Sequence, residues 1–299
     1  MTVLADPSGR LRAILSADRP TVAPGAVDPL TARIIEGLGF DAVYLGGNAM
    51  GSHIGVGQPF ISLTETIDIA RNVIRAVEVP VIVDIGTGFG DPPHIHRTIS
   101  ECEYAHIAAV QIDDQPYPKR AAYHRGLGEV VSLDEAAARL VAATAARKDH
   151  DLVLIARTDV YRVTRSLEAA AQRCRAFAAA GADVVMVLDL DTAQAADLAE
   201  HLPRGALLGW IGGATNSGPS LKELADAGIR LAVFPFNTLA AIVQAVADTW
   251  SVLRDQGRLQ QSPEMLAEAR ERLIDLTGLR AYWAIEDCAF RTDEGTGRT

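Results

Sequence analysis

The fold is decided by two stretches, Pro80-Val81-Ile82-Val83-Asp84-Ile85-Gly86-Thr87-Gly88-Phe89-Gly90 and Val110-Gln111-Ile112-Asp113-Asp114-Gln115-Pro116-Tyr117-Pro118-Lys119-Arg120. Each begins as a short apolar run rich in β-branched residues, which is typical of a buried parallel strand. Each run stops at a carboxylate, Asp84 or Asp113. In a repeating β/α protein the ends of the strands form the mouth of a barrel, where metals and substrates bind. The alternative is that the two carboxylates only cap the helices that follow.

Working outward, apolar strand-like runs alternate with amphipathic helical segments from residue 20 to about residue 255. The pattern predicts eight strands, at residues 21–23, 42–45, 81–84, 108–113, 152–156, 184–188, 206–210 and 231–234. Helices are predicted at 28–37, 64–77, 92–104, 133–147, 166–179, 221–227 and 238–253. Several of them end in a glycine just before the next strand, which is the usual helix C-cap.

Eight such units predict an α/β protein with a (β/α)8 TIM barrel. The alternative is a doubly wound open sheet. A sheet of that kind more often has a Gly-rich dinucleotide-binding turn after its first strand, and this chain has Pro24-Gly25-Ala26-Val27-Asp28 there.

The pattern changes after residue 255. Residues 256–261 are polar, and Ser262-Pro263 then opens a helix with serine as N-cap and proline at the first helical position. We therefore expect a catalytic barrel at residues 1–255 and a C-terminal helical extension at 256–299, with helices at 264–277 and 279–285. Apolar residues on these helices favour an oligomer contact, in a homodimer or homotetramer, although they could also cover the barrel base.

Composition narrows the classes of protein that the chain can represent. It has 299 residues, of which 48% are hydrophobic and 22% charged, and its formal net charge is −10. No basic cluster is visible, which argues against nucleic-acid binding. The three cysteines are far apart and indicate neither a disulfide framework nor a cysteine zinc site. No signal peptide and no apolar run of ~18 residues is found, so we expect a cytoplasmic protein without membrane contact.

Several segments resemble the isocitrate lyase/phosphoenolpyruvate mutase superfamily over about residues 20–250. Residues 22–28 with 32–33 and 39–44 are similar to the family's first unit, 84–90 to its D-A-D-T-G-Y-G signature and 112–120 to its I-E-D-Q-x-x-P-K-R segment. Residues 155–159 match its I-A-R-T-D strand end, and Phe234-Pro235 its last strand. Within the family, the chain is identified as a divergent member that resembles methylisocitrate lyase-like proteins.

This resemblance implies Mg²⁺ (or Mn²⁺) and a small carboxylate substrate at the barrel mouth. It also implies an enzyme that breaks or forms C–C or P–C bonds next to a carboxylate through enolate-like species. Such chemistry is plausible at this mouth, because a cation and hydrogen-bond donors stabilise developing enolate charge.

Roles can be assigned to individual residues on this basis. The metal ligands are expected to be Asp84 and Asp113. Substrate binding is expected from Tyr44, from Gly46 and Gly47 through their backbone amides, and from Asn48, Arg157 and Trp210. Arg157 suits a bidentate bond to a carboxylate. Catalytic roles are expected for Lys119, His124 and Asp113, with surface positions as the alternative for Lys119 and His124.

The chain also departs from the family pattern. Gly86 and Gln58 replace expected carboxylates, and Asp113 replaces a longer glutamate. The lyase branch carries a cysteine in K-R-C-G-H, whereas this chain has Ala121 after Lys119-Arg120. We expect the metal site to be weakened and another residue to replace the missing thiol.

The sequence therefore favours a carbon–carbon lyase that acts on a 2-oxo or 2-hydroxy acid through a metal-stabilised enolate-like intermediate. Within the enzyme class, the alternatives are a phosphonopyruvate- or phosphoenolpyruvate-type mutase or hydrolase, and an oxo-acid decarboxylase. The alternative from another class is a catalytically silent barrel that binds a small acid.

Overall fold

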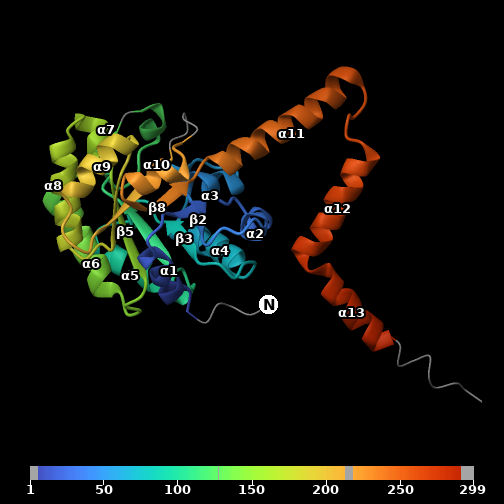
Figure 1. The fold of residues 1–299 in the computed structure, drawn as a ribbon, viewed down its shortest axis with the longest axis horizontal. Helices are drawn as coiled ribbons and strands as arrows, with labels where there is room; N and C mark the ends of the chain where they lie inside the picture. The colour runs from blue at the N-terminus through green and yellow to red at the C-terminus, as the bar shows by residue number, and fades with distance from the viewer. Residues whose placement is uncertain (1–5, 127, 213–217, 291–299) are drawn as a thin grey trace, which may run out of the picture. The chain divides into compact units, whose positions relative to one another are not determined.

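The computed structural model describes residues 6–126, 128–212 and 218–290 (Figure 1). Eight parallel strands form one sheet in the order β1-β8-β7-β6-β5-β4-β3-β2. The strands are β1 (Thr21–Pro24), β2 (Val43–Leu45), β3 (Val81–Asp84), β4 (Ala109–Asp113), β5 (Val153–Thr158), β6 (Val184–Val187), β7 (Leu207–Ile211) and β8 (Ile229–Phe234). A bridge between Gly25 and Tyr44 brings β1 next to β2, so the sheet closes into a barrel.

The barrel confirms the prediction of a (β/α)8 fold, and the open-sheet alternative is wrong. All eight predicted strands are present, and none of their ends is displaced by more than two residues. The alternation of helix and strand is regular because each helix has a local start signal. Ser62, for example, accepts a hydrogen bond from the backbone of Glu65 while the Glu65 carboxylate accepts one from the backbone of Ser62.

The helices that follow the strands surround the barrel (Figure 1). They are α2 (Pro29–Gly37), α4 (Leu63–Ile74), α5 (Pro92–Tyr104), α6 (Leu133–Ala146), α8 (Leu167–Ala179), α9 (Thr192–Glu200) and α10 (Leu221–Asp226), whereas α11 (Asn237–Gln256), which follows β8, belongs mostly to a second compact unit. Shorter helices lie in the loops at the carboxyl ends of the strands: α3 (Gly47–His53), η1 (Gln58–Phe60), η2 (Ala121–Arg125) and α7 (Val160–Thr164). The pattern did not predict these four, α9 or the N-terminal α1 (Pro7–Ser16).

The buried apolar side chains form two clusters. One lies between the strands and the surrounding helices, and the other includes the inward side chains of the strands, such as Ala108 and Val153. Leu11 and Leu15 of α1 belong to the second cluster and are almost completely buried. Arg12 of the same helix donates to the carbonyls of Asp151 and Leu152, just before β5 and at its start. Helix α1 thus closes the barrel at the amino ends of its strands.

The chain divides into two compact units, Met1–Ala240 and Ala241–Thr299. The second unit contains most of α11 together with α12 (Pro263–Thr277) and α13 (Leu279–Phe290). Both predicted C-terminal helices are therefore present, and α13 continues five residues beyond its predicted end. In the described part of the chain, no helix combines the length and apolar character that a membrane span requires.

Candidate functional site

A cavity of about 460 Å³ opens at the carboxyl ends of the barrel strands. Its lining comes from residues at or near the ends of β2, β3, β5, β6 and β7 and from loops that follow the strands, including those after β4 and β8. The residues with polar side chains in this lining are Tyr44, Asn48, Gln58, Asp84, Tyr123, His124, Arg157, Arg162, Arg165 and Asp189. The site is therefore polar and rich in arginine, which suits an anionic ligand.

Asp84 ends β3 and lies at the bottom of this cavity, with only 5% of its surface exposed. Its Oδ1 accepts a hydrogen bond of 2.8 Å from the Gly86 backbone, and its Oδ2 accepts bonds from the Gly47 backbone (3.1 Å) and from Nε2 of Gln58 (3.2 Å). All three donors are neutral. Burial, and then the nearby charge of Asp113, raise the pKa of Asp84.

Gly47 is required by this arrangement, because a Cβ atom at that position would collide with the Gln58 amide. The Gly47 N–H points at Asp84, so it is not free for the substrate oxygen that we expected it to hold. Gly46 lines the cavity and remains a candidate for that role.

Asp113 ends β4 and is held by positive charge. Its Oδ2 lies 3.1 Å from Nζ of Lys119 and 3.5 Å from Nη1 of Arg157, and its Oδ1 accepts a bond from Nε2 of Gln111. Burial alone would raise the pKa of Asp113, but Arg157 and Lys119 outweigh it and lower that pKa. Asp113 is thus a paired carboxylate, which argues against its predicted role as a second direct metal ligand.

Arg157 is the last residue but one of the neighbouring strand β5, and its guanidinium is almost completely enclosed by polar partners. Its Nε and Nη2 donate to the two oxygens of Asp159 at 2.9 and 3.1 Å, and Nη2 also donates to the Tyr123 hydroxyl at 2.7 Å. Burial acts to lower the pKa of Arg157, but Asp113 and Asp159 more than offset it, so the guanidinium is charged. The planar fork that was predicted to grip a substrate carboxylate thus already grips Asp159.

Lys119 is similarly buried and charged. Burial acts to lower its pKa, and the charges of Asp113 and Asp84 reverse the effect and raise that pKa. Lys119 lines a small second cavity of about 40 Å³ next to the main one, and Asp84 lines both. Two cations and two carboxylates therefore meet at the base of the site.

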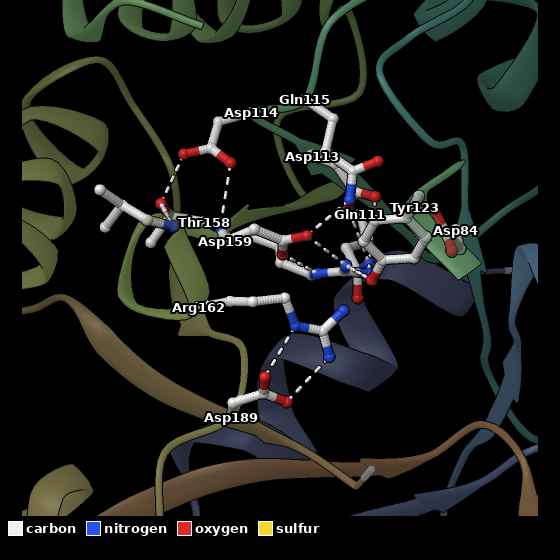
Figure 2. Close-up of polar contacts among 12 residues, drawn as sticks. Asp84, Gln111, Asp113, Asp114, Gln115, Tyr123, Thr158, Asp159, Arg162 and Asp189 are labelled. Atoms are coloured by element: carbon white, nitrogen blue, oxygen red, sulfur yellow. Dashed lines mark hydrogen bonds and ion pairs between the residues drawn. The ribbon is translucent and has the colours of Figure 1, made fainter. Parts of the chain in front are cut away.

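Another ion pair lies at the rim of the cavity (Figure 2). Arg162 on α7 donates from Nε and Nη2 to Asp189, at 2.7 and 3.0 Å. Asp189 has a left-handed backbone, with φ of 68°, which is uncommon for a residue other than glycine. The ring of Tyr123 lies between this rim and the base, with its centre 5.3 Å from Cζ of Arg162 and 5.0 Å from Nζ of Lys119.

A buried polar layer behind the site supports it (Figure 2). Asp114 accepts hydrogen bonds from the Thr158 hydroxyl, the Asp159 backbone and Nη1 of Arg173. Burial raises the pKa of Asp114 to about 6. Asp159, which orients Arg157, also accepts a bond from Gln115.

Neither Asp84 nor Asp113 caps the helix that follows its strand, so that alternative is wrong. The N-cap of α5 is Asp91, and that of α6 is Ser132, whose hydroxyl accepts from the Glu135 backbone. Asp84 instead accepts from the first residue of α3.

Most of the predicted site residues come together at the mouth. The lining of the main cavity includes Tyr44, Gly46, Gly47, Asn48, Asp84, His124 and Arg157. The Tyr44 hydroxyl is already used, as it donates to Gln111. His124 is mainly solvent-exposed, and burial followed by the charge of Lys119 lowers its pKa.

The structure does not agree with the prediction that Trp210 binds substrate. It is not among the lining residues. Its indole N–H donates to the Leu190 carbonyl and its ring packs against Phe234, with ring centres 5.3 Å apart. Its side chain points away from the cavity because it belongs to the packed layer around the barrel.

Four residues of the site were missed as candidates: Tyr123, Arg162, Arg165 and Asp189. All of them lie on loops after strands rather than at strand ends. The available signal for Arg162, Arg165 and Asp189 was their position shortly after the predicted strands 152–156 and 184–188, since loops at this end of the strands reach the mouth of any such barrel.

The side chains at the site can be compared with the ligands that a metal ion requires. Among the described residues, no group of three or more His, Cys, Asp and Glu side chains could hold a metal ion. Asp84 is nevertheless a buried carboxylate that faces the cavity and has no ion-pair partner in the described part of the chain. A cation held by Asp84, with the remaining ligands from water and a bound acid, fits these residues.

A family model described as phosphoenolpyruvate phosphomutase matches residues 11–253. A 2,3-dimethylmalate lyase of Eubacterium barkeri is 34% identical over 286 residues, covering 93% of this chain and 96% of that protein. An oxaloacetate decarboxylase of a Bradyrhizobium species (strain ORS 278) is 34% identical over 284 residues, with 90% and 96% of the two chains covered.

Solved structures agree in fold. Oxaloacetate acetylhydrolase in complex with the inhibitor 3,3-difluorooxalacetate has a TM-score of 0.85 at 30% identity, covering 95% of this chain and 98% of that one. Phosphonopyruvate hydrolase, solved with oxalate and Mg²⁺, has a TM-score of 0.82 over 94% and 98% of the two chains. Its identity is 24%, so this likeness concerns the fold alone.

Proposed function

The chain belongs to the phosphoenolpyruvate mutase/isocitrate lyase superfamily, and from that membership we propose that it is a carbon–carbon lyase. Relatives in this superfamily are lyases, hydrolases, mutases and decarboxylases of carboxylic acids. The proposed substrate is a 2-oxo or 2-hydroxy acid, which is cleaved (or formed) next to a carboxylate through an enolate-like intermediate.

The observation that carries the proposal is the buried charge cluster of Asp84, Asp113, Lys119 and Arg157. Burying ion pairs costs desolvation free energy that their mutual attraction does not reliably recover. A barrel that only had to fold would be at least as stable with apolar residues at these positions. The cluster faces a cavity, so a role in binding and chemistry accounts for it.

In this proposal the chain's own groups have distinct tasks. Lys119 and Arg157 supply fixed positive charge where negative charge develops in the transition state. Asp113 keeps both cations in place. The amide of Gly46 and the side chain of Asn48 orient the acid at the edge of the cavity.

Mg²⁺ or Mn²⁺ would be held by Asp84 and by oxygens of the substrate. When bound, such an ion would add positive charge for an enolate oxygen. Gln58 donates a hydrogen bond to Asp84 where the family carries a carboxylate, so the protein itself supplies little negative charge for the ion.

Two candidate functions within the enzyme class remain close to this one. The decarboxylase relative supports decarboxylation of an oxo acid, and the matching family model supports phosphomutase chemistry, to which a phosphonate hydrolase would be chemically related. All of these use the same features, namely bound carboxylate and stabilised enolate charge.

Product analysis tests the proposal. The purified protein with Mg²⁺ is incubated with 2,3-dimethylmalate, oxaloacetate and phosphonopyruvate, and products are followed by NMR. We expect a 2-hydroxy or 2-oxo acid to be split at a C–C bond without consumption of water, which distinguishes a lyase from a hydrolase that adds water across that bond. Release of CO₂ would indicate the decarboxylase, and release of phosphate the hydrolase. A protein that binds oxalate and converts no acid would be the silent barrel.

A further inference from the structure

Among the described residues that line the cavity, Tyr123 is the one whose hydroxyl is both aligned by a buried cation and free to donate. We propose that Tyr123 is a catalytic residue, whose hydroxyl gives its proton to the enolate-like carbon after bond cleavage. This inference rests on the proposed function. It concerns the task that a thiol would perform if the chain had one in this loop.

The first step is where Tyr123 lies. It is on η2, in the loop after β4, and lines the main cavity. Figure 2 shows the ring close to the site carboxylates, with its hydroxyl in the hydrogen-bond network. Its Oη is 2.7 Å from Nη2 of Arg157, which fixes the hydroxyl above the base of the site.

The second step is the direction of the proton. A guanidinium can only donate, so the bond from Arg157 occupies a lone pair of the phenol oxygen and not its hydrogen. Within the described residues, Tyr123 Oη has no hydrogen-bond acceptor among its contacts. The hydroxyl hydrogen is therefore available to a ligand in the cavity. By contrast, the hydroxyl of Tyr44 is already donated to Gln111.

The third step is the charge that remains after transfer. A phenolate at this position would be bonded to Arg157, and the ring is also close to Lys119 and Arg162. Fixed cations stabilise such an anion most strongly where water is excluded. Burial raises the pKa of Tyr123, so the free protein holds the hydroxyl protonated, as a proton donor must be.

His124, the residue predicted for this task, is less suitable. Burial and the charge of Lys119 lower its pKa, so at neutral pH the ring carries no extra proton to give. Its ring meets the edge of the Tyr123 ring, 5.3 Å between centres, and it is mainly exposed. Tyr123 lies deeper and is the better oriented donor.

The proposed step balances as follows for a 2-hydroxy acid. The hydroxyl proton passes to water, the C–C bond breaks, and its electron pair stays on the carbon next to the second carboxylate. That carbon takes the Tyr123 proton and forms a C–H bond. The phenolate then takes a proton back from water, so the protein returns to its starting state.

Oxalate is the probe, because it is a small planar dianion whose oxygens can accept a hydrogen bond from a hydroxyl in the cavity. Tyr123→Phe keeps the ring and its contacts with the cations while it removes the hydroxyl. The matched control is Tyr161→Phe, which removes a hydroxyl that is bonded to Gln194 and does not line the cavity. Oxalate affinity is measured by calorimetry, and turnover on the acids named above by NMR.

We expect Tyr123→Phe to weaken oxalate binding about tenfold or more, as the loss of a hydrogen bond to a charged ligand does. We also expect it to lower kcat about 100-fold or more with a smaller change in KM, while Tyr161→Phe behaves like wild type. If Tyr123→Phe binds oxalate as tightly as the wild type or has an unchanged kcat, the inference about Tyr123 is wrong but the proposed function stands. The same holds if the wild-type protein does not bind oxalate. Wild-type protein that binds oxalate and converts no acid would overturn the proposed function, and the transfer step with it.

Discussion

The side-chain amide of Gln58 donates a hydrogen bond of 3.2 Å to Oδ2 of Asp84, and both residues are buried at the base of the cavity. Because the amide N–H is a donor, the bond from Gln58 occupies one lone pair of Asp84 that a cation could otherwise use. A carboxylate in place of this amide would instead have supplied a further ligand for the cation. Three carboxylates, Asp84, Asp113 and Asp159, meet two cations, Lys119 and Arg157, so the region carries one net negative charge when all of them are ionised. A divalent ion alone would leave this region with excess positive charge.

The first prediction concerns the affinity of the protein for Mg²⁺ and Mn²⁺. Mg²⁺ and Mn²⁺ should bind weakly to the free protein and measurably better together with oxalate, whose two negative charges restore the balance. Asp84→Asn should remove binding under both conditions. Gln58→Glu should strengthen binding without oxalate, because it adds a carboxylate beside Asp84. Calorimetric titration of the ion, with and without oxalate, measures all three. Tight binding to the free wild-type protein, or full activity in excess EDTA, would contradict the prediction.

The second prediction concerns Lys119. Lys119→Met keeps the size of the side chain but leaves Asp113 with Arg157 as its remaining cation, and removes one positive charge from the site. We expect kcat/KM to fall by about 100-fold or more, as happens when one group that stabilises transition-state charge is removed. Lys119→Arg keeps the charge and should lose less. Steady-state kinetics on the substrate found by product analysis is the measurement, and equal losses in both variants would show that shape, not charge, matters.

The third prediction concerns pH and Asp114. Its pKa is about 6 in the folded protein against 3.8 for the unperturbed group, so the folded state binds the proton more tightly than the unfolded state. Stability should therefore fall as the pH rises from about 4 to about 6, by roughly 3 kcal/mol from this group. Asp113, whose pKa is lowered, acts in the opposite sense and only below about pH 4.

Asp114→Asn carries no charge at any pH and should show a smaller loss of stability over the same range. Urea unfolding at pH 4.5 and pH 6.5 gives the free energy of unfolding of each protein. The variant can be less stable at every pH, because Asn cannot accept from Arg173 and Thr158 as a carboxylate does. The test is the slope of the free energy of unfolding against pH, which is expected to be smaller in the variant than in the wild type. Parallel slopes would show that Asp114 is already ionised below pH 4.5.

The fourth prediction concerns assembly. Helices α12 and α13 expose Leu266, Leu273, Tyr282, Trp283 and Phe290, all at 41% or more of their surface. Exposed apolar residues of this density mark interaction surfaces. We expect light scattering to give two or four times the chain mass of 31.8 kDa. Replacing both Tyr282 and Trp283 by alanine should lower that mass, whereas Tyr104→Ala, at an exposed position at the end of α5, should not. A mass of about 32 kDa for the wild type at micromolar concentration would contradict it.

The barrel could be predicted from the sequence because its strands are short apolar runs with clear ends. The run 81–84 is buried along its whole length and stops at Asp84, as predicted. The helices that were missed have weaker local signals. Helix α3 contains Gly47 and Gly51, and its first N–H is satisfied by Asp84, which lies 37 positions further along the chain. A contact of that kind is not visible in local periodicity.

The residues of the site also divide into those that the sequence indicated and those that it did not. Asp84, Asp113, Lys119 and Arg157 were found because they belong to strand ends or to a contiguous motif. Tyr123 was not, because its hydrogen bond to Arg157, 34 residues away, is created only in the folded barrel. For the same reason the sequence did not show that Arg157 is already paired with Asp159, or that Trp210 turns outward.

Helix α1 closes the amino ends of the strands with Leu11 and Leu15. The barrel interior is filled with packed side chains, and in the described part of the chain the cavity lies at the carboxyl ends of the strands, so a molecule that enters the site there leaves by the same opening. If one bond is cut and two fragments form, the fragment near the rim has to depart before the one at the base can follow. If the proposed cleavage takes place, release from such a site would be sequential, with the acid held beside Asp84 and Lys119 leaving last.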